Sequence, residues 1–280
     1  QEITLSSEIN DFIWKGLNQY YYWQSDVSNL SDSKATMESE YLALLNSQQD
    51  SKEFFEDLLH QDDRFSWIEE DYEVLENQLS GTTASNGMKF QLYVRDDGES
   101  IIGAVTYVLS DSDAFNKGVK RGDIFNSVNN NELNFNNYMS LLYGEQTSYS
   151  IQLVNYDPEN DLVTSRDVSV TLNKEENFQE VPVHNISIIE HGSKNVGYVM
   201  YNKFLGTVDS DGDGEVDRDF NEELINLFVY LKSQNLDELV LDLRYNGGGS
   251  VNTCTYLASL ITGQFTGTIF AKQIWNEKIM

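Results

Sequence analysis

The amino-acid sequence predicts a multidomain α+β protein with three successive parts. Residues 1–82 repeat apolar side chains at helical spacing and lack glycine between Leu17 and Leu79, which predicts a small helical bundle. Residues 83–176 alternate short β-rich runs with turn clusters such as DDG and KRGD, which predicts a compact β domain. Residues 185–280 read as strand, helix, strand, helix, the order of a parallel α/β sheet.

Charge separates the first part from the rest and limits the partners. The chain has 46 acidic and 18 basic residues among 280, a formal net charge of −28, and residues 1–80 hold 18 acidic and 4 basic side chains. This balance excludes binding of nucleic acid or anionic membranes through bulk charge, and it disfavours very acidic ligands at low salt. No apolar run approaches the roughly 18 residues of a membrane span, so we expect no transmembrane segment.

The elements expected in the third part can be placed along the chain. A connector, EENFQEVPVHN, should lead into it, and a further β-like run, GTIFAKQIW, should follow its last helix. The expected connector, strand, helix, strand, helix and β-like run are residues 175–185, 195–204, 221–235, 237–245, 250–262 and 267–275.

A glycine triplet, Gly247 to Gly249, follows the buried-type strand 239–243, which is apolar apart from Asp242. Ligands of open α/β sheets bind at the carboxyl ends of the strands, and the next helix directs free N–H groups at negative charge. A phosphate site would need a nearby cation, but the next basic residue after Arg244 is Lys272. An oxyanion site is therefore favoured over phosphate, with a plain strand-to-helix turn as the open alternative.

Three segments of the sequence resemble segments of one protein family. The string LVLDLRYNGGG resembles the signature strand and loop of the carboxyl-terminal processing, or tail-specific, serine peptidases, and VGYVMYNKFL resembles the first strand of their catalytic domain. Between the helical part and these strings, NGMKF and SDSDAFNKGVKRGDIFNSVNNNEL resemble the PDZ domain that such peptidases carry. The resemblance covers residues 85–280. It implies a PDZ-like domain at 83–176 and the first part of an α/β serine peptidase domain at 185–280, and the acidic helical domain expected at 1–82 resembles the amino-terminal region of some lipoprotein-like members of the family.

The resemblance also implies a catalytic arrangement. In that family a serine activated by a lysine attacks the peptide bond, and backbone amides hold the oxyanion. Carried over to this chain, Gly248 and, as second candidate, Gly247 supply an oxyanion N–H, and Asp242, Arg244 and Asn246 hold the loop in shape.

The nucleophile and base are expected after Met280, in a Gly-Ser-Ala-like turn and a later helix. Ser250 reads as the N-cap of a helix, and Lys272 and Lys278 precede the expected serine, so none of them is assigned to catalysis. The 280-residue chain is accordingly expected to show no turnover.

Gly87, Met88, Lys89 and Phe90 match the family's loop that receives a peptide carboxylate. The strand after this loop would pair with a bound peptide by β-augmentation. This predicts polypeptide substrates bound through their carboxyl termini. An ordinary turn into a strand is the alternative.

An acidic loop follows the first strand of the third part. It has the carboxylate and glycine spacing of the first half of an EF-hand calcium loop, with candidate ligands Asp209, Asp211, Asp213 and Asp217. Position 12, normally a bidentate glutamate, is Phe220, so Glu222 or Glu223 would have to replace it. No cofactor is required for the predicted chemistry. Calcium binding is one interpretation of this loop, and a solvated acidic turn without metal is the alternative.

Three function hypotheses follow. The first is a serine endopeptidase of the C-terminal processing type, the second a non-catalytic PDZ-containing peptide-binding or scaffolding protein, and the third a calcium-dependent envelope binding protein. The family resemblance predicts the bacterial periplasm or cell envelope as location, with a lipid anchor ahead of residue 1 as one form. The single cysteine, Cys254, excludes an internal disulfide framework and leaves the compartment open.

Overall fold

The computed structural model describes residues 5–209, 213 and 215–279. Contacts within the chain divide it into two compact units. One unit is formed by Gln1–Tyr72 together with Gly267–Met280, and the other by Glu73–Thr266. The predicted class, a mixed α+β protein with an amino-terminal helical part, is confirmed, whereas the three predicted domains stay a prediction.

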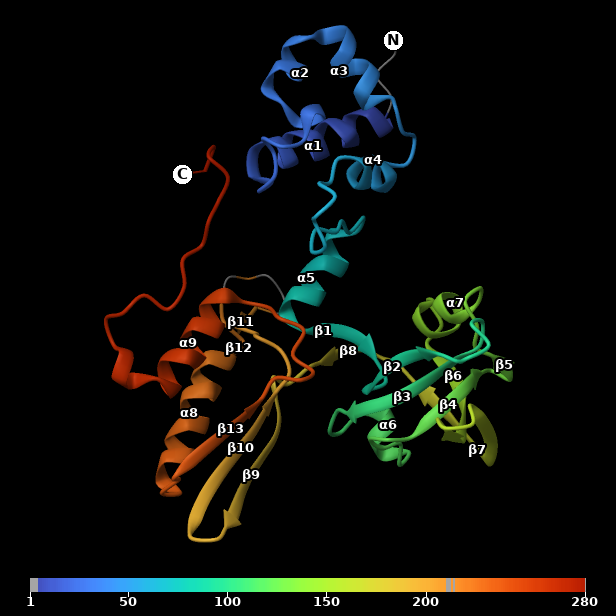
Figure 1. Ribbon diagram of the computed structural model, residues 1–280, viewed down its shortest axis with the longest axis vertical. Helices are drawn as coiled ribbons and strands as arrows, with labels where there is room; N and C mark the ends of the chain where they lie inside the picture. The colour runs from blue at the N-terminus through green and yellow to red at the C-terminus, as the bar shows by residue number, and fades with distance from the viewer. Residues whose placement is uncertain (1–4, 210–212, 214, 280) are drawn as a thin grey trace. The chain divides into compact units, whose positions relative to one another are not determined.

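The first unit is a helical bundle. Its core is formed by the buried side chains of Ile13, Trp14, Leu30, Phe54 and Leu58, of which Ile13, Phe54 and Leu58 belong to the helical spacings read from the sequence. Its helices are α1 (Leu5–Tyr20), the short 3-10 turn η1 (Ser28–Leu30), α2 (Asp32–Thr36), α3 (Glu38–Leu45) and α4 (Ser51–Asp57) (Figure 1).

The β-like run predicted at residues 267–275 forms no strand in the structure. The segment belongs to the helical unit, where Asn276 Nδ2 donates to the carbonyls of Gln19 at 3.0 Å and Tyr21 at 2.9 Å. A strand needs the hydrogen-bonding edge of another strand, and a helical bundle offers none. The prediction of a strand here was therefore wrong. The apolar side chains of Ile269 and Phe270 are exposed.

Helix α5 (Tyr72–Ser80) begins at the last residue of the first unit's amino-terminal segment and otherwise belongs to the second unit, where a two-stranded ribbon follows it. Strand β1 (Thr82–Ser85) pairs antiparallel with β8 (Glu175–Gln179), so Thr82 lies opposite Gln179. The connector predicted at residues 175–185 is thus mostly strand. Sequence periodicity could not show this, because the paired residues of β1 and β8 are 90 to 97 positions apart in the chain.

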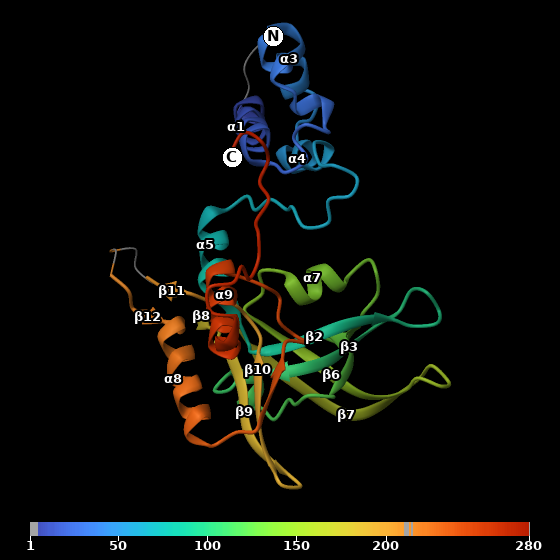
Figure 2. The same ribbon diagram turned by 60° about the vertical axis from the view of Figure 1, so that its left-hand side comes forward.

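A six-stranded antiparallel sheet follows. Its main order is β2-β3-β4-β6-β7, with β5 on β4, so β2 forms one edge. Figure 2 labels β2, β3, β6 and β7 of this sheet. The buried side chains of Phe125, Ile151 and Leu172 lie at the centre of its core. Its elements are β2 (Met88–Val94), β3 (Ile101–Val108), α6 (Asp113–Asn116), β4 (Ile124–Val128), β5 (Asn131–Glu132), α7 (Tyr138–Tyr143), β6 (Ser148–Asp157) and β7 (Leu162–Asn173).

The last part of this unit is a three-stranded sheet of order β13-β10-β9. The central strand β10 and the outer strand β13 are parallel, as the sequence predicts, and Met200 lies opposite Asp242. The antiparallel partner of β10, strand β9, was not predicted. Helices α8 and α9 pack on the sheet around Tyr201, Leu224 and Leu257 (Figure 1). The elements are β9 (Val183–His191), β10 (Lys194–Tyr201), β11 (Thr207–Val208), β12 (Arg218–Asp219), α8 (Phe220–Ser233), β13 (Glu238–Asp242), α9 (Val251–Ile261) and the 3-10 turn η2 (Gly263–Phe265).

Candidate active site and peptide groove

The glycine loop leaves the carboxyl end of β13 and pairs with the segment after β10. Phe204 N–H donates to the Gly248 carbonyl and Ser250 N–H donates to the Phe204 carbonyl, both at 2.8 Å. Gly249 has a φ of +126°, and a Cβ on it would lie 2.2 Å from the Phe204 carbonyl oxygen. Only glycine permits this approach, so the sequence of the loop follows from its pairing with Phe204.

The two amides predicted to bind an oxyanion both have acceptors within the chain. Gly248, at a φ of +103°, donates to Asn246 Oδ1 at 2.8 Å, and Gly247 donates to the Asn202 carbonyl at 3.3 Å. An oxyanion would therefore have to replace or share the Asn246 acceptor to use the Gly248 amide. The assignment of Gly248 and Gly247 stays a prediction.

The side chains predicted to support the loop are joined by hydrogen bonds. Arg244 forms a two-point contact with buried Asp242, Nε to Oδ1 at 2.9 Å and Nη2 to Oδ2 at 2.6 Å, and Tyr198 Oη donates to Oδ2 at 2.6 Å. These contacts from Arg244 and Tyr198 hold the pKa of Asp242 well below its ordinary value. Asn246 Nδ2 ties the loop to the Tyr201 carbonyl at 3.0 Å. Tyr198 is a member of this network that sequence reasoning missed.

The three residues set aside from catalysis lie as follows. Ser250 Oγ accepts from Thr253 N–H at 3.2 Å, which confirms it as the N-cap of α9. Lys278 belongs to the helical unit, where it pairs with Asp32 and donates to Asn18 Oδ1 at 2.9 Å. Lys272 also falls in that unit.

The acidic loop lies between β11 and β12, and its candidate ligand Asp211 lies outside the described residues. At position 12 Phe220 is buried against Leu205 and Val208, and Glu223 forms a two-point ion pair with Arg218, Nε to Oε1 at 2.6 Å. Across residues 5–209, 213 and 215–279 there is no group of three or more His, Cys, Asp or Glu side chains placed to hold a metal ion.

Calcium binding at this loop stays a prediction, and the melting temperature of the chain tests it directly. Binding should raise the melting temperature of the chain in a concentration-dependent way, because a ligand that binds only the folded state stabilises it. Magnesium should raise it much less, since it tolerates irregular oxygen ligands poorly. An Asp213→Asn variant should lose the calcium shift. An unchanged melting temperature at millimolar calcium would leave the loop as solvated surface.

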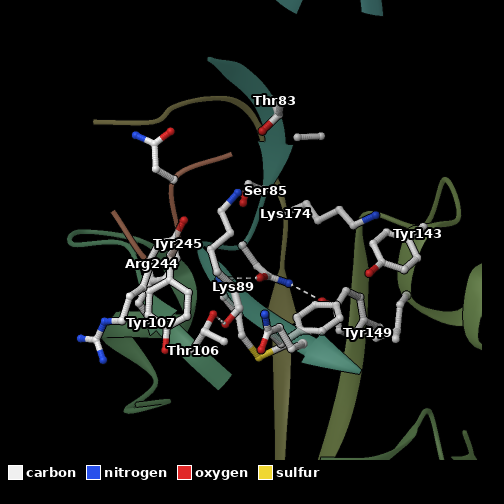
Figure 3. A pocket seen from close by; sticks show the side chains of 17 residues that line it. Thr83, Ser85, Lys89, Thr106, Tyr107, Tyr143, Tyr149, Lys174, Arg244 and Tyr245 are labelled. Carbon is white, nitrogen blue, oxygen red and sulfur yellow. Dashed lines mark hydrogen bonds between the residues drawn. The ribbon is translucent and has the colours of Figure 1, made fainter. Parts of the chain in front are cut away.

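The loop predicted to bind peptides opens a groove of about 610 Å³ at the edge strand β2 (Figure 3). Gly87 N–H donates to Ser85 Oγ and Met88 N–H to Asn86 Oδ1, both at 3.0 Å, so two loop amides are held in local turns. Lys89 lines the groove and forms an ion pair with Glu180, which stands beyond the lining. The structure thus brings Met88, Lys89 and Phe90 to one cavity, whereas Gly87 is not among the residues that line it.

Lys174 is a groove residue that sequence reasoning missed. It follows β7, lines the groove near Tyr143, and donates to the Gly144 carbonyl at 2.9 Å (Figure 3). No carboxylate within the described part of the chain lies at ion-pair distance from its ammonium, and burial lowers its pKa. A lone lysine at the end of a strand gives no sequence signal, because α7 and β2 form the groove only in the fold.

The groove also reaches the glycine loop. Arg244, Tyr245 and Asn246 contribute to its lining, and the Tyr245 ring lies 5.6 Å from that of Tyr107 on β3. The Arg121 guanidinium lies 5.3 Å from the centre of the same ring. A peptide in the groove would therefore contact both the edge of the six-stranded sheet and the loop after β13.

These features define a class, a multidomain α+β protein in which an antiparallel sheet and the loop after β13 line one groove. The protein family described as "Peptidase S41 N-terminal domain" matches residues 8–67 of the chain, and the one described as "Peptidase family S41" matches residues 195–276. The chain belongs to peptidase family S41.

The fold is similar to that of a solved S41 protease. A crystal structure from Bacteroides fragilis described as an S41 protease has a TM-score of 0.54 and 22% identity, over 86% of this chain and 56% of that one. The photosystem II D1 C-terminal processing protease has a TM-score of 0.44 and 16% identity, over 92% of this chain and 65% of that one. The chain thus spans less than two thirds of either length. No curated protein matches it.

Proposed function

We propose that the protein is a serine endopeptidase of the C-terminal processing type. Its six-stranded sheet acts as a PDZ-like module that captures the carboxyl terminus of a polypeptide, and a serine and a lysine expected after Met280 hydrolyse the peptide bond. The observation that carries the proposal is the shared groove, which the edge strand β2 and the glycine loop line together.

The chemistry assigned to the chain's own residues is limited to binding and positioning. The edge of β2 would offer backbone groups to an extended peptide, and the loop from Gly87 to Phe90 is the proposed receiver of its terminal carboxylate. Asp242, Arg244 and Asn246 hold the glycine loop, whose Gly248 amide would stabilise the oxyanion once the Asn246 acceptor is displaced.

The proposed location is the bacterial periplasm or cell envelope. No helix in the described part of the chain has the length and apolar character needed to cross a membrane. The alternative function, a non-catalytic peptide-binding protein, would use the same groove. Measured peptide hydrolysis distinguishes the two functions, because only the peptidase hydrolyses peptides.

Peptide capture can be measured on the 280-residue chain. Peptides with apolar last residues and a free carboxyl terminus should bind more tightly than their amidated forms, by roughly 1 to 3 kcal/mol, because amidation removes a charge-assisted hydrogen bond. Isothermal titration calorimetry with acid and amide pairs measures the difference. Equal affinities would reject capture through the carboxyl terminus.

A further inference from the structure

The groove differs in charge from the rest of the chain. Acidic residues number 46 among 280 in the sequence but none among the 17 that line the groove, whereas the lining includes Lys89, Lys174 and Arg244. Figure 3 shows these three cations at separate places around the cavity. A protein with a net charge of −28 thus presents a lining without carboxylates where a ligand would bind.

Two of these three cations have a counter-charge within the chain. Lys89 pairs with Glu180 and Arg244 pairs with Asp242, and both carboxylates stand outside the lining. The Lys174 ammonium has only the neutral Gly144 carbonyl as a hydrogen-bond partner among the described residues. A half-buried ammonium without an anion interacts more strongly with an incoming carboxylate than an exposed, screened one does.

We propose that the groove selects peptides that carry acidic side chains close to their free carboxyl terminus, with Lys174 as the specificity-determining residue. The inference rests on the proposed peptide capture and names its substrate class. The sequence alone points the other way, because the net charge should repel acidic ligands. That repulsion acts at long range, and at physiological salt the Debye length of about 8 Å leaves the cations in contact with the ligand as the dominant charges.

The test compares three peptides on the 280-residue chain by calorimetry at physiological salt. They share length, apolar last residue and free carboxyl terminus, and carry Glu, Gln or Lys at the third and fourth positions from the end. The Glu peptide should bind about three- to tenfold more tightly than the Gln peptide, and the Lys peptide more weakly than both. Equal affinities of the Glu and Gln peptides would overturn the proposal.

Variants assign the effect to one side chain. Lys174→Gln should reduce the preference for Glu to within about twofold, whereas Lys174→Arg, which keeps the charge, should retain it. Lys117→Gln removes the same charge from an exposed position just after α6, outside the lining, and should leave the preference intact. Melting temperatures show that each variant is folded.

The outcomes separate this inference from the proposed function. If the acid peptide binds more tightly than its amide but Glu and Gln peptides bind equally, only the selectivity fails. If acid and amide bind equally, the proposed capture fails. If Lys174→Gln abolishes the difference between acid and amide instead, Lys174 holds the terminal carboxylate and the selectivity is overturned.

Discussion

Replacing Gly249 by alanine should lower the free energy of unfolding of the second unit by about 3 kcal/mol. The added Cβ would lie 2.2 Å from the Phe204 carbonyl oxygen and 2.9 Å from its carbon, and the backbone φ of +126° is one that alanine rarely adopts. Phe204 cannot move aside without breaking its hydrogen bonds to Gly248 and Ser250. The measurement is urea denaturation, with hydrogen exchange at the Ser250 amide as the local readout.

The neighbouring glycines provide matched controls. A Cβ added at Gly247 would meet no described atom within 4 Å, and the backbone there needs no positive φ, so Gly247→Ala should change stability by no more than about 1 kcal/mol. Gly248 also faces open space but has a φ of +103°, so Gly248→Ala should cost an intermediate amount, about 1 to 2 kcal/mol. Three equal effects would contradict the close approach to Phe204.

Local patterns in the sequence predicted the elements whose partners are near in the chain. The strands at 195–204 and 237–245 and the helices at 221–235 and 250–262 are all present, because each has the apolar spacing of its own element. Strand β8 was missed, since it is polar and pairs with β1 across the whole six-stranded module. Residues 267–275 have strand-like spacing but no strand beside them, so pattern alone misled the prediction.

In the candidate site, too, the sequence predicted only the side chains that lie close together in the chain. Asp242, Arg244 and Asn246 lie within five residues of each other, and their string could be read directly. Tyr198 joins them only because β10 and β13 run parallel in a register that places its hydroxyl 2.6 Å from Asp242. Lys174 reaches the groove only because the residue after β7 lies beside the loop after α7, where its ammonium donates to the Gly144 carbonyl and its amide to the Thr147 carbonyl. Contacts between distant segments therefore had to come from the structure.

Gly248→Val should lower kcat about a hundredfold or more, with a smaller change in KM, in a form of the protein that carries the expected serine and lysine. A β-branched side chain is strongly disfavoured at a φ of +103°, so valine should turn the Gly248 amide away from the position that an oxyanion would occupy. Binding of the ground-state peptide along β2 does not use this amide, which is why KM should change less. Steady-state kinetics on a peptide with a free carboxyl terminus measures both constants.

Two comparisons make this result specific to the Gly248 amide. Gly247→Val tests the second candidate, whose amide donates to the Asn202 carbonyl, and it should lower kcat less than Gly248→Val does. The 280-residue chain, which is expected to lack the nucleophile and base, should show no turnover and sets the background. Because the Gly248 amide now donates to Asn246 Oδ1, the oxyanion must compete with that acceptor, and a folded Gly248→Val enzyme with unchanged kcat would show that it does not bind there. Turnover by the 280-residue chain itself would contradict the placement of the serine and lysine after Met280.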